Sequence, residues 1–136
     1  MSRARTDAGM VTAFVTIFVV AVLFVIGLVI DGGYMLAVRQ KAMNEAESAA
    51  RAGAQVLDID SVRGGGDPEL DPGGAEARAE QYLEARGLDG DATATTGSVT
   101  VTVRIVHSPI LLSIGGMGDR TITGSGSSRA TQGTAP

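Results

Sequence analysis

Residues Gly9–Ile30 read GMVTAFVTIFVVAVLFVIGLVI, and this uncharged stretch decides the fold of the chain. At about 1.5 Å of rise per residue, a helix of this length covers roughly 30 Å, the thickness of the hydrocarbon core of a bilayer. Its clearly polar side chains are Thr12 and Thr16, whose hydroxyls can bond to the preceding helical turn. The stretch therefore predicts a transmembrane helix over residues 9–30 and a membrane protein with a single span.

The alternative interpretation of this stretch is a cleaved secretory signal, whose apolar region normally covers about 7–15 residues before a small-x-small cleavage site. The run here is longer, and the residues that follow it, Asp31–Tyr34, contain no such site. These features favour an uncleaved anchor. Positive charges on the two flanks are nearly equal in number, so they do not fix the orientation. The short leader, residues 1–8, stays inside easily, which predicts a cytoplasmic N-terminus and an exported C-terminal domain at the cytoplasmic (inner) membrane.

Composition narrows the classes of function. The chain has 136 residues, a net charge of −4 and no cysteine. The absence of cysteine excludes disulfides, zinc–thiolate sites and thiol catalysis. The acidic balance argues against nucleic acid as a partner, because a basic surface would be expected there. Outside the span, the remaining residues suffice for one small domain that is poor in aromatic side chains.

A second helical pattern follows the span directly. Met35–Leu57 consists almost wholly of good helix formers, so a helix extension is predicted over residues 31–57. Small side chains recur along it, mostly at three- and four-residue spacing, and form a narrow stripe for helix packing: Val38, Ala42, Ala46, Ala49, Ala50 and Gly53. Two interpretations of this stripe stay open, packing on the chain's own domain and contact with another subunit.

The junction between span and extension is Asp31-Gly32-Gly33. Glycine costs about 1 kcal/mol relative to alanine inside a helix, so a kink or hinge is predicted at this membrane boundary. A helix that runs through the glycines instead would extend from Met10 to Leu57, over roughly 70 Å. The Asp31 carboxylate is expected to reach headgroup water, and the alternative is that it meets a partner charge on a neighbouring subunit.

Residues 58–73 are predicted to form a loop that is punctuated by glycine and proline and rich in acidic side chains. Calcium, which takes six to eight oxygen ligands, is one candidate for such a loop. EF-hand spacing is absent, so a solvated loop is favoured over a calcium site. The acidic residues are Asp58, Asp60, Asp67, Glu69 and Asp71.

The following segment predicts one more helix and then strands. The helix is expected to start just after Asp71, with Pro72 in its first turn, and to stop at Gly87. Ser98–Val106 alternates between two faces at period two, with valine and isoleucine on one of them, which is typical of a strand with one buried face. A preceding strand over 92–96 would complete a hairpin through the glycine at position 97.

The end of the chain completes the predicted fold. A final strand is expected over 121–128, and the apolar patch Ile110–Ile114 is too short to span a membrane. The fold class is thus α+β, with a transmembrane helix, its amphipathic extension and a small extracytoplasmic domain over 74–128. That domain holds a short helix and an antiparallel sheet of about three strands. The tail, residues 129–136, is predicted to be disordered.

Residues suited to catalysis or cofactor binding are few. His107, the single histidine, lies beside Ser108 without an identified orienting acid, so a structural or solvent-facing role is favoured. Glycine clusters at 64–66 and 115–118 match neither the dinucleotide pattern nor the phosphate-loop pattern. The sequence therefore predicts that the protein is not an enzyme and needs no cofactor or metal ion.

The segments follow one another in a specific order, marked by Gly9, Asp31-Gly32-Gly33-Tyr34, the alanine-rich Asn44–Ala54, Val99–Val103, Pro109 and Gly115-Gly116. These residues and their order resemble those of pilins and pseudopilins, and more closely those of the TadE/TadG-type proteins of the tight-adherence (Flp) pilus system. The resemblance implies a pilin-like fold and a minor pilin-like subunit or assembly factor of a pilus or secretion machine. A membrane-anchored binding module unrelated to pili is the alternative.

The resemblance also implies partners: the lipid bilayer, other pilus or secretion-system subunits, and a prepilin peptidase. In pilin-like members the peptidase cuts after a glycine, here Gly9, which leaves Met10 as the new N-terminus. Pilins usually carry glutamate at the fifth position after that cut, whereas this chain has Phe14. This departure leaves both processing and entry into a filament open. A charged group in the apolar run is costly without a partner, so phenylalanine makes residence in the membrane easier.

Overall fold

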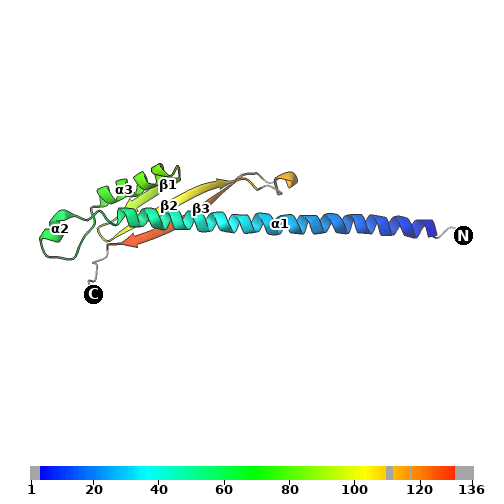
Figure 1. The fold of residues 1–136 in the computed structure, drawn as a ribbon, viewed down its shortest axis with the longest axis horizontal. Coiled ribbons are helices and arrows are strands. Elements are labelled where there is room, and N and C mark those ends of the chain that lie inside the picture. Colours follow the sequence, from blue (N-terminus) through cyan, green and yellow to red (C-terminus); the bar gives the residue numbers. More distant parts are fainter. Residues whose placement is uncertain (1–3, 110–111, 117, 131–136) are drawn as a thin grey trace. The chain divides into compact units, whose positions relative to one another are not determined.

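The computed structural model describes residues 4–109, 112–116 and 118–130 (Figure 1). The elements are α1 (Ala4–Gly53), α2 (Ile59–Arg63), α3 (Pro72–Ala85), β1 (Asp89–Ala94), β2 (Ser98–His107), the 3₁₀ turn η1 (Leu112–Gly115) and β3 (Arg120–Arg129). A long apolar helix, a second helix and a three-stranded antiparallel sheet confirm the predicted α+β fold class. The chain divides into two compact units, each described by itself below.

Unit 1 consists of Met1–Tyr34 and Ser108–Gly118. It contains the apolar part of α1 and η1, which lies in the connection between β2 and β3. Unit 2 consists of Met35–His107 and Asp119–Pro136 and contains the rest of α1, α2, α3 and the sheet. Parts of the predicted leader (1–3), apolar patch (110–111) and tail (131–136) lie outside the described residues.

Helix α1 differs from the expectation at its junction and at both ends. It is helical at every residue from Ala4 to Gly53, including Asp31-Gly32-Gly33, so the predicted kink or hinge is not a break in the helix. It already includes the last residues of the predicted leader. It ends before Leu57, because Leu57 forms an isolated bridge with Leu70 and the Val56 carbonyl accepts a hydrogen bond from the amide of Asp71.

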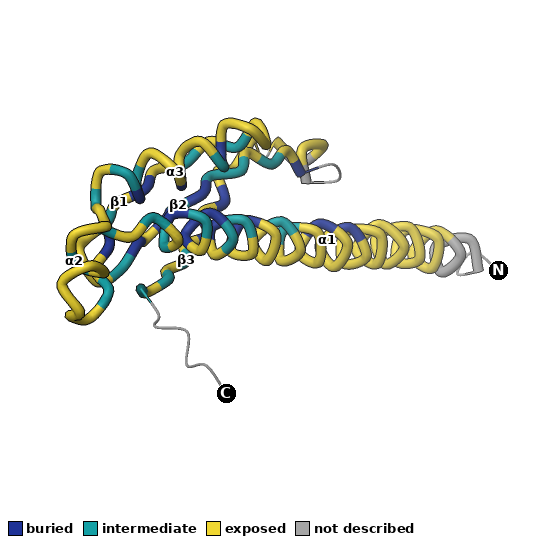
Figure 2. Tube along the Cα trace, turned by 60° about the vertical axis from the view of Figure 1, so that its left-hand side comes forward, coloured by how far each residue is buried: buried dark blue, intermediate teal, exposed yellow. Residues whose placement is uncertain are grey.

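The sheet of unit 2 has the order β1-β2-β3, and both pairings are antiparallel. Its buried face carries Val99, Val101 and Val103 of β2. Residues of both α1 and α3 form the core with these valines, and the buried residues are dark blue in Figure 2. A Cβ built on Gly124, which is paired with Val103, would meet α1, and one built on Gly90, also paired with Val103, would meet Leu83 of α3. Unit 2 is thus a two-layer α/β structure with helices on one side of the sheet.

Helix α3 begins and ends as the sequence predicted. Asp71 is the N-cap residue and Pro72 occupies the first turn. At the other end Gly87 has a φ of 64°, which favours glycine. Its amide donates to the Glu84 carbonyl, and the amide of Leu88 donates to the Leu83 carbonyl. This pair of bonds is the Schellman motif, which satisfies two carbonyls that the helix end would leave without partners.

Three segments depart from their predicted forms. The acidic loop is partly folded, since it contains α2, whose N-cap Asp58 accepts from the amide of Asp60, and the buried Leu70. Strand β1 begins at Asp89, earlier than expected, because its register with β2 continues to the pair Asp89–Arg104. Strand β3 includes Arg129, which is paired with Ser98, so the predicted disordered tail is wrong at that residue.

Replacing both Gly32 and Gly33 by alanine is expected to stabilise the protein. A Cβ at either position has open space and neither residue has a positive φ, so alanine adds helix propensity of up to about 1 kcal/mol per site. The measurement is thermal unfolding of the full chain in nanodiscs, followed by circular dichroism. Gly65→Ala is the matched control, because its Cβ also has space but its φ is 71°, which predicts destabilisation. A lower midpoint for the double variant than for wild type would mean that the glycines are needed as a flexible joint.

Candidate functional site: the surfaces of helix α1

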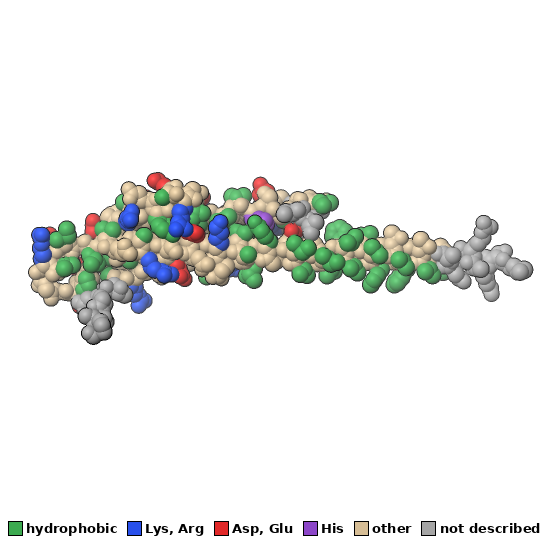
Figure 3. All heavy atoms as spheres, viewed as in Figure 1, with side chains coloured by type: hydrophobic (Ala, Val, Ile, Leu, Met, Phe, Trp, Pro, Cys, Tyr) green, Lys and Arg blue, Asp and Glu red, His purple; other side chains and the backbone are tan. Residues whose placement is uncertain are grey.

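The apolar part of α1 presents large hydrophobic side chains on nearly all sides. These side chains are exposed, and they include Met10, Phe14, Ile17, Leu23, Phe24 and Val29. Figure 3 shows the hydrophobic side chains along this part of the helix. Leaving one such side chain in water forgoes about 1.5–3 kcal/mol of burial free energy. Of the described residues, one helix is long and apolar enough to cross a membrane, and its stretch lies within Gly9–Gly53. A helix that is apolar all round suits a lipid environment.

Asp31, at the end of the apolar run, is buried. Its exposed fraction is 3%, so the expectation of a carboxylate in headgroup water is wrong for this residue. Gly27, one turn earlier on the same helix face, is buried as well, and so is Pro109 of the segment that shares unit 1 with the helix. The segment that shares the unit with this part of the helix is far away in sequence, and no periodicity around Asp31 reveals its burial.

Within unit 2, α1 approaches the sheet unusually closely. Ala42, Ala46, Ala49, Ala50 and Gly53 are buried, and Val38 is half-buried. A Cβ on Gly124 of β3 would lie 2.5 Å from the Met43 nitrogen, and one on Gly126 would lie 2.4 Å from the Glu47 nitrogen. The backbone of the helix therefore rests directly on two glycines of the strand.

The repeat of this contact follows from simple geometry. Four helical residues rise about 6 Å, and two strand residues rise about 6.7 Å. An alanine at every fourth helix position therefore stays in step with a glycine at every second strand position when both run in the same direction. The pairs Ala42 with Gly124 and Ala46 with Gly126 have this order. These glycines were not predicted as packing positions, although the alternation Gly124-Ser125-Gly126-Ser127 in the last strand is their signal in the sequence.

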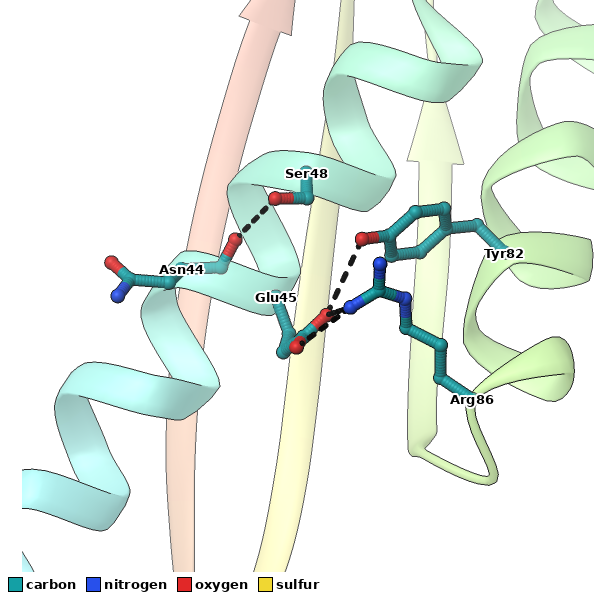
Figure 4. A network of polar contacts seen from close by, with 5 residues as sticks. All are labelled: Asn44, Glu45, Ser48, Tyr82 and Arg86. Carbon is teal, nitrogen blue, oxygen red and sulfur yellow. Dashed lines mark hydrogen bonds and ion pairs between the residues drawn. The ribbon is translucent and has the colours of Figure 1, made fainter.

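A polar network also joins α1 to α3 (Figure 4). The Arg86 guanidinium donates from Nη1 to both carboxylate oxygens of Glu45, at 3.1 Å each, and the Tyr82 hydroxyl donates to Oε2 at 3.4 Å. Arg86 also lies over the Tyr82 ring, with its Cζ 4.6 Å from the centroid. The Glu45 side chain is 18% exposed and that of Arg86 is 51% exposed. The network joins α1 to α3 beside the small-residue stripe, and we expect it to help to set the rotation of α1 about its axis.

A double-mutant cycle on Glu45→Gln and Arg86→Met is expected to give a coupling energy of about 1 kcal/mol or less, because solvent screens a half-exposed pair. The measurement is denaturant unfolding of wild type, both single variants and the double variant. Glu47 and Arg51, an exposed pair at 3.0 Å on α1 itself, supply the control cycle. Equal coupling in the two cycles would remove the proposed role of the network in orienting the helix.

The part of the extension that faces away from the sheet is mostly polar, with isolated apolar side chains. Leu36 is 69% exposed and Met43 is also exposed, while Gln40 and Asn44 share a side-chain hydrogen bond of 3.0 Å beside them. This mixture leaves room for contacts with other subunits and does not itself define a pocket.

Among the residues that the structure describes, side chains suited to catalysis are not gathered in one place. An open hollow of about 500 Å³ is lined by residues from 56 to 71, among them Asp58, Asp60 and Asp71. In the described ranges, no group of three or more His, Cys, Asp or Glu side chains could hold a metal ion. His107 lies at the end of β2 and is half-buried. These observations do not place a nucleophile, a base and an acid together.

Gly9 and Met10, the candidate cleavage position, both lie in α1 and are exposed. Asp31, Gly32 and Gly33 lie in the same helix, and the stripe of small residues follows in its last turns. The apolar segment, the junction and the stripe are thus successive parts of one helix.

Comparison with known proteins finds one similarity, and it falls on helix α1 and the residues just after it. Residues 9–56 match the family model Tad, described as "Putative Flp pilus-assembly TadE/G-like". The match confirms the predicted resemblance over this part of the chain. It covers α1 from Gly9 onward and ends three residues after Gly53. No curated protein and no solved structure matches the chain.

Proposed function

We propose that the chain is a non-enzymatic, single-pass membrane subunit of a tight-adherence-type pilus or secretion machine, as a minor pilin-like component or an assembly factor. The observation that carries the proposal is the coincidence of the family match with α1, over the apolar segment and the small-residue stripe. The matched residues therefore include the candidate anchor and the surface on which the sheet is built.

In this proposal the apolar segment crosses the cytoplasmic membrane, with the N-terminus inside and unit 2 outside. Lipid covers the exposed hydrophobic side chains of α1, which the chain itself leaves uncovered. The polar exterior of unit 2 suits an aqueous compartment, since its exposed side chains on β3 are threonine, serine and arginine. Other pilus subunits contact the outward face of the extension around Leu36. Prepilin peptidase is proposed to act at Gly9–Met10.

The test combines gene deletion with photo-crosslinking in the native host. Deletion is expected to abolish surface filaments, and the wild-type gene is expected to restore them. Benzoylphenylalanine at position 36 is expected to crosslink to another pilus component, identified by mass spectrometry. The control is the same probe at position 100, an exposed threonine of β2. Normal filaments after deletion, without a crosslink to a pilus component, would favour a membrane-anchored binding module instead.

A further inference from the structure

The connection between β2 and β3 is uncharged and partly apolar. Ser108–Gly118 reads SPILLSIGGMG, and the next residue is Asp119. The described part includes η1, closed by a hydrogen bond of 3.0 Å from the Gly116 amide to the Ser113 carbonyl. Gly116 has a φ of 87°, so the chain turns sharply after η1 at a residue that tolerates this conformation. A connection between strands is usually polar and faces water, and this one departs from that composition.

Ile114 is the most exposed of the large hydrophobic side chains in the described chain, with an exposed fraction of 84%. An isoleucine held on a tight turn in water forgoes most of its burial free energy. Ile114 is not among the residues of the buried hydrophobic core, which come from α1, α3, the sheet and the segment that contains Leu70. Ile114 belongs to unit 1, so the other residues of that unit define its environment.

Unit 1 places this connection with the end of the apolar run. The unit contains Ser108–Gly118 and α1 as far as Tyr34, and its buried residues, among those described, are Gly27, Asp31 and Pro109. Gly27, which has no side chain, is buried one turn before Asp31. On the other sides of the same turn, Leu28, Val29 and Ile30 are exposed. The connection thus lies at the level of the last lipid-facing turn of the helix.

We infer that η1 is a second lipid-contacting element, which inserts Ile114 into the bilayer interface beside the apolar part of α1. This inference rests on the proposed membrane anchor. Lipid is the partner of the exposed Ile114 side chain. The reason is that this side chain continues the apolar surface of α1, which lipid covers in the proposed anchor. Insertion removes Ile114 from water. The same arrangement covers Asp31, whose charge is costly to expose to hydrocarbon, so the connection shields the carboxylate where the helix leaves the lipid.

Because the chain has no cysteine, each cysteine that is introduced is the single labelling site of its variant. Full-length Ile114→Cys, Leu23→Cys and Thr100→Cys variants carry a nitroxide label in liposomes of phosphatidylethanolamine and phosphatidylglycerol. Collision rates with oxygen and with a water-soluble nickel chelate then report the depth of each label. All three side chains are exposed, so the substitutions leave the packing of both units intact. Leu23 is the reference for the span, and Thr100 of β2 is the reference for water.

We expect the label at position 114 to be at least roughly threefold less accessible to the nickel chelate than that at position 100, as for an interfacial side chain. The label at position 23 is expected to be the least accessible. If position 23 is protected and position 114 is as accessible as position 100, η1 does not contact lipid and the anchor stands. If position 23 is itself accessible to the chelate, the membrane anchor fails and the inference about η1 fails with it.

Discussion

Gly126→Val is expected to destabilise the protein by about 3 kcal/mol or more. The Cβ of any replacement would lie 2.4 Å from the Glu47 nitrogen and 2.7 Å from its Cα. These atoms belong to the backbone of α1, so no side chain can rotate away to make room. The helix must move off β3, which exposes the core formed by Ala42, Ala46 and the valines of β2.

The measurement is thermal or denaturant unfolding of full-length protein in nanodiscs. Gly97→Ala is the matched control, since it also replaces a glycine near the sheet, but its Cβ has open space and its φ is not positive. The control is expected to change stability by less than about 0.5 kcal/mol. A Gly126→Val protein as stable as the control would show that α1 does not rest on β3 at this point.

The combined replacement of Val19 and Leu23 by arginine is expected to release the protein from membranes. Both side chains are exposed on α1 in the middle of the apolar run. Each arginine at the centre of a bilayer costs about 2.5–3.5 kcal/mol on the insertion scale, and the two positions are one helical turn apart. The measurement is the fraction of protein that alkaline carbonate extracts from membranes, which is expected to rise from nearly none to most of the protein.

Replacement of Gln40 and Asn44 by arginine provides the control for this change. These residues are also exposed, have the same four-residue spacing and lie on α1 beyond the apolar run. Their replacement adds the same charge and is expected to leave the protein in the membrane fraction. If both double variants remain equally membrane-bound, α1 is not the anchor.

The sequence predicted best where one local pattern decides the structure. The uncharged run 9–30 fixed the apolar part of α1, because length and composition suffice for a membrane helix. Alternation in β2 gave a strand with buried Val99, Val101 and Val103. Pro72 and Gly87 marked the first turn and the end of α3, because each restricts the backbone on its own.

The sequence predicted poorly where contacts distant along the chain decide. Gly32 and Gly33 indicated a kink, yet the helix continues through them, since helix propensity is a weak term beside the hydrogen bonds of a long helix. The expected helix end at Leu57 was wrong, because Leu57 pairs with Leu70. The role of Gly124 and Gly126 depends on the alanines of α1, and a glycine in a strand does not reveal which backbone approaches it.

The most direct test of the account is the topology of the chain across the membrane. The single-cysteine variant Ser125→Cys, the sole cysteine of its chain, is treated in spheroplasts with a membrane-impermeant maleimide, and a cysteine-bearing cytoplasmic protein is the control. The account predicts labelling at position 125 without permeabilisation, and labelling of the cytoplasmic protein only after it. Labelling of position 125 only after permeabilisation would contradict the account, because the domain would then lie in the cytoplasm.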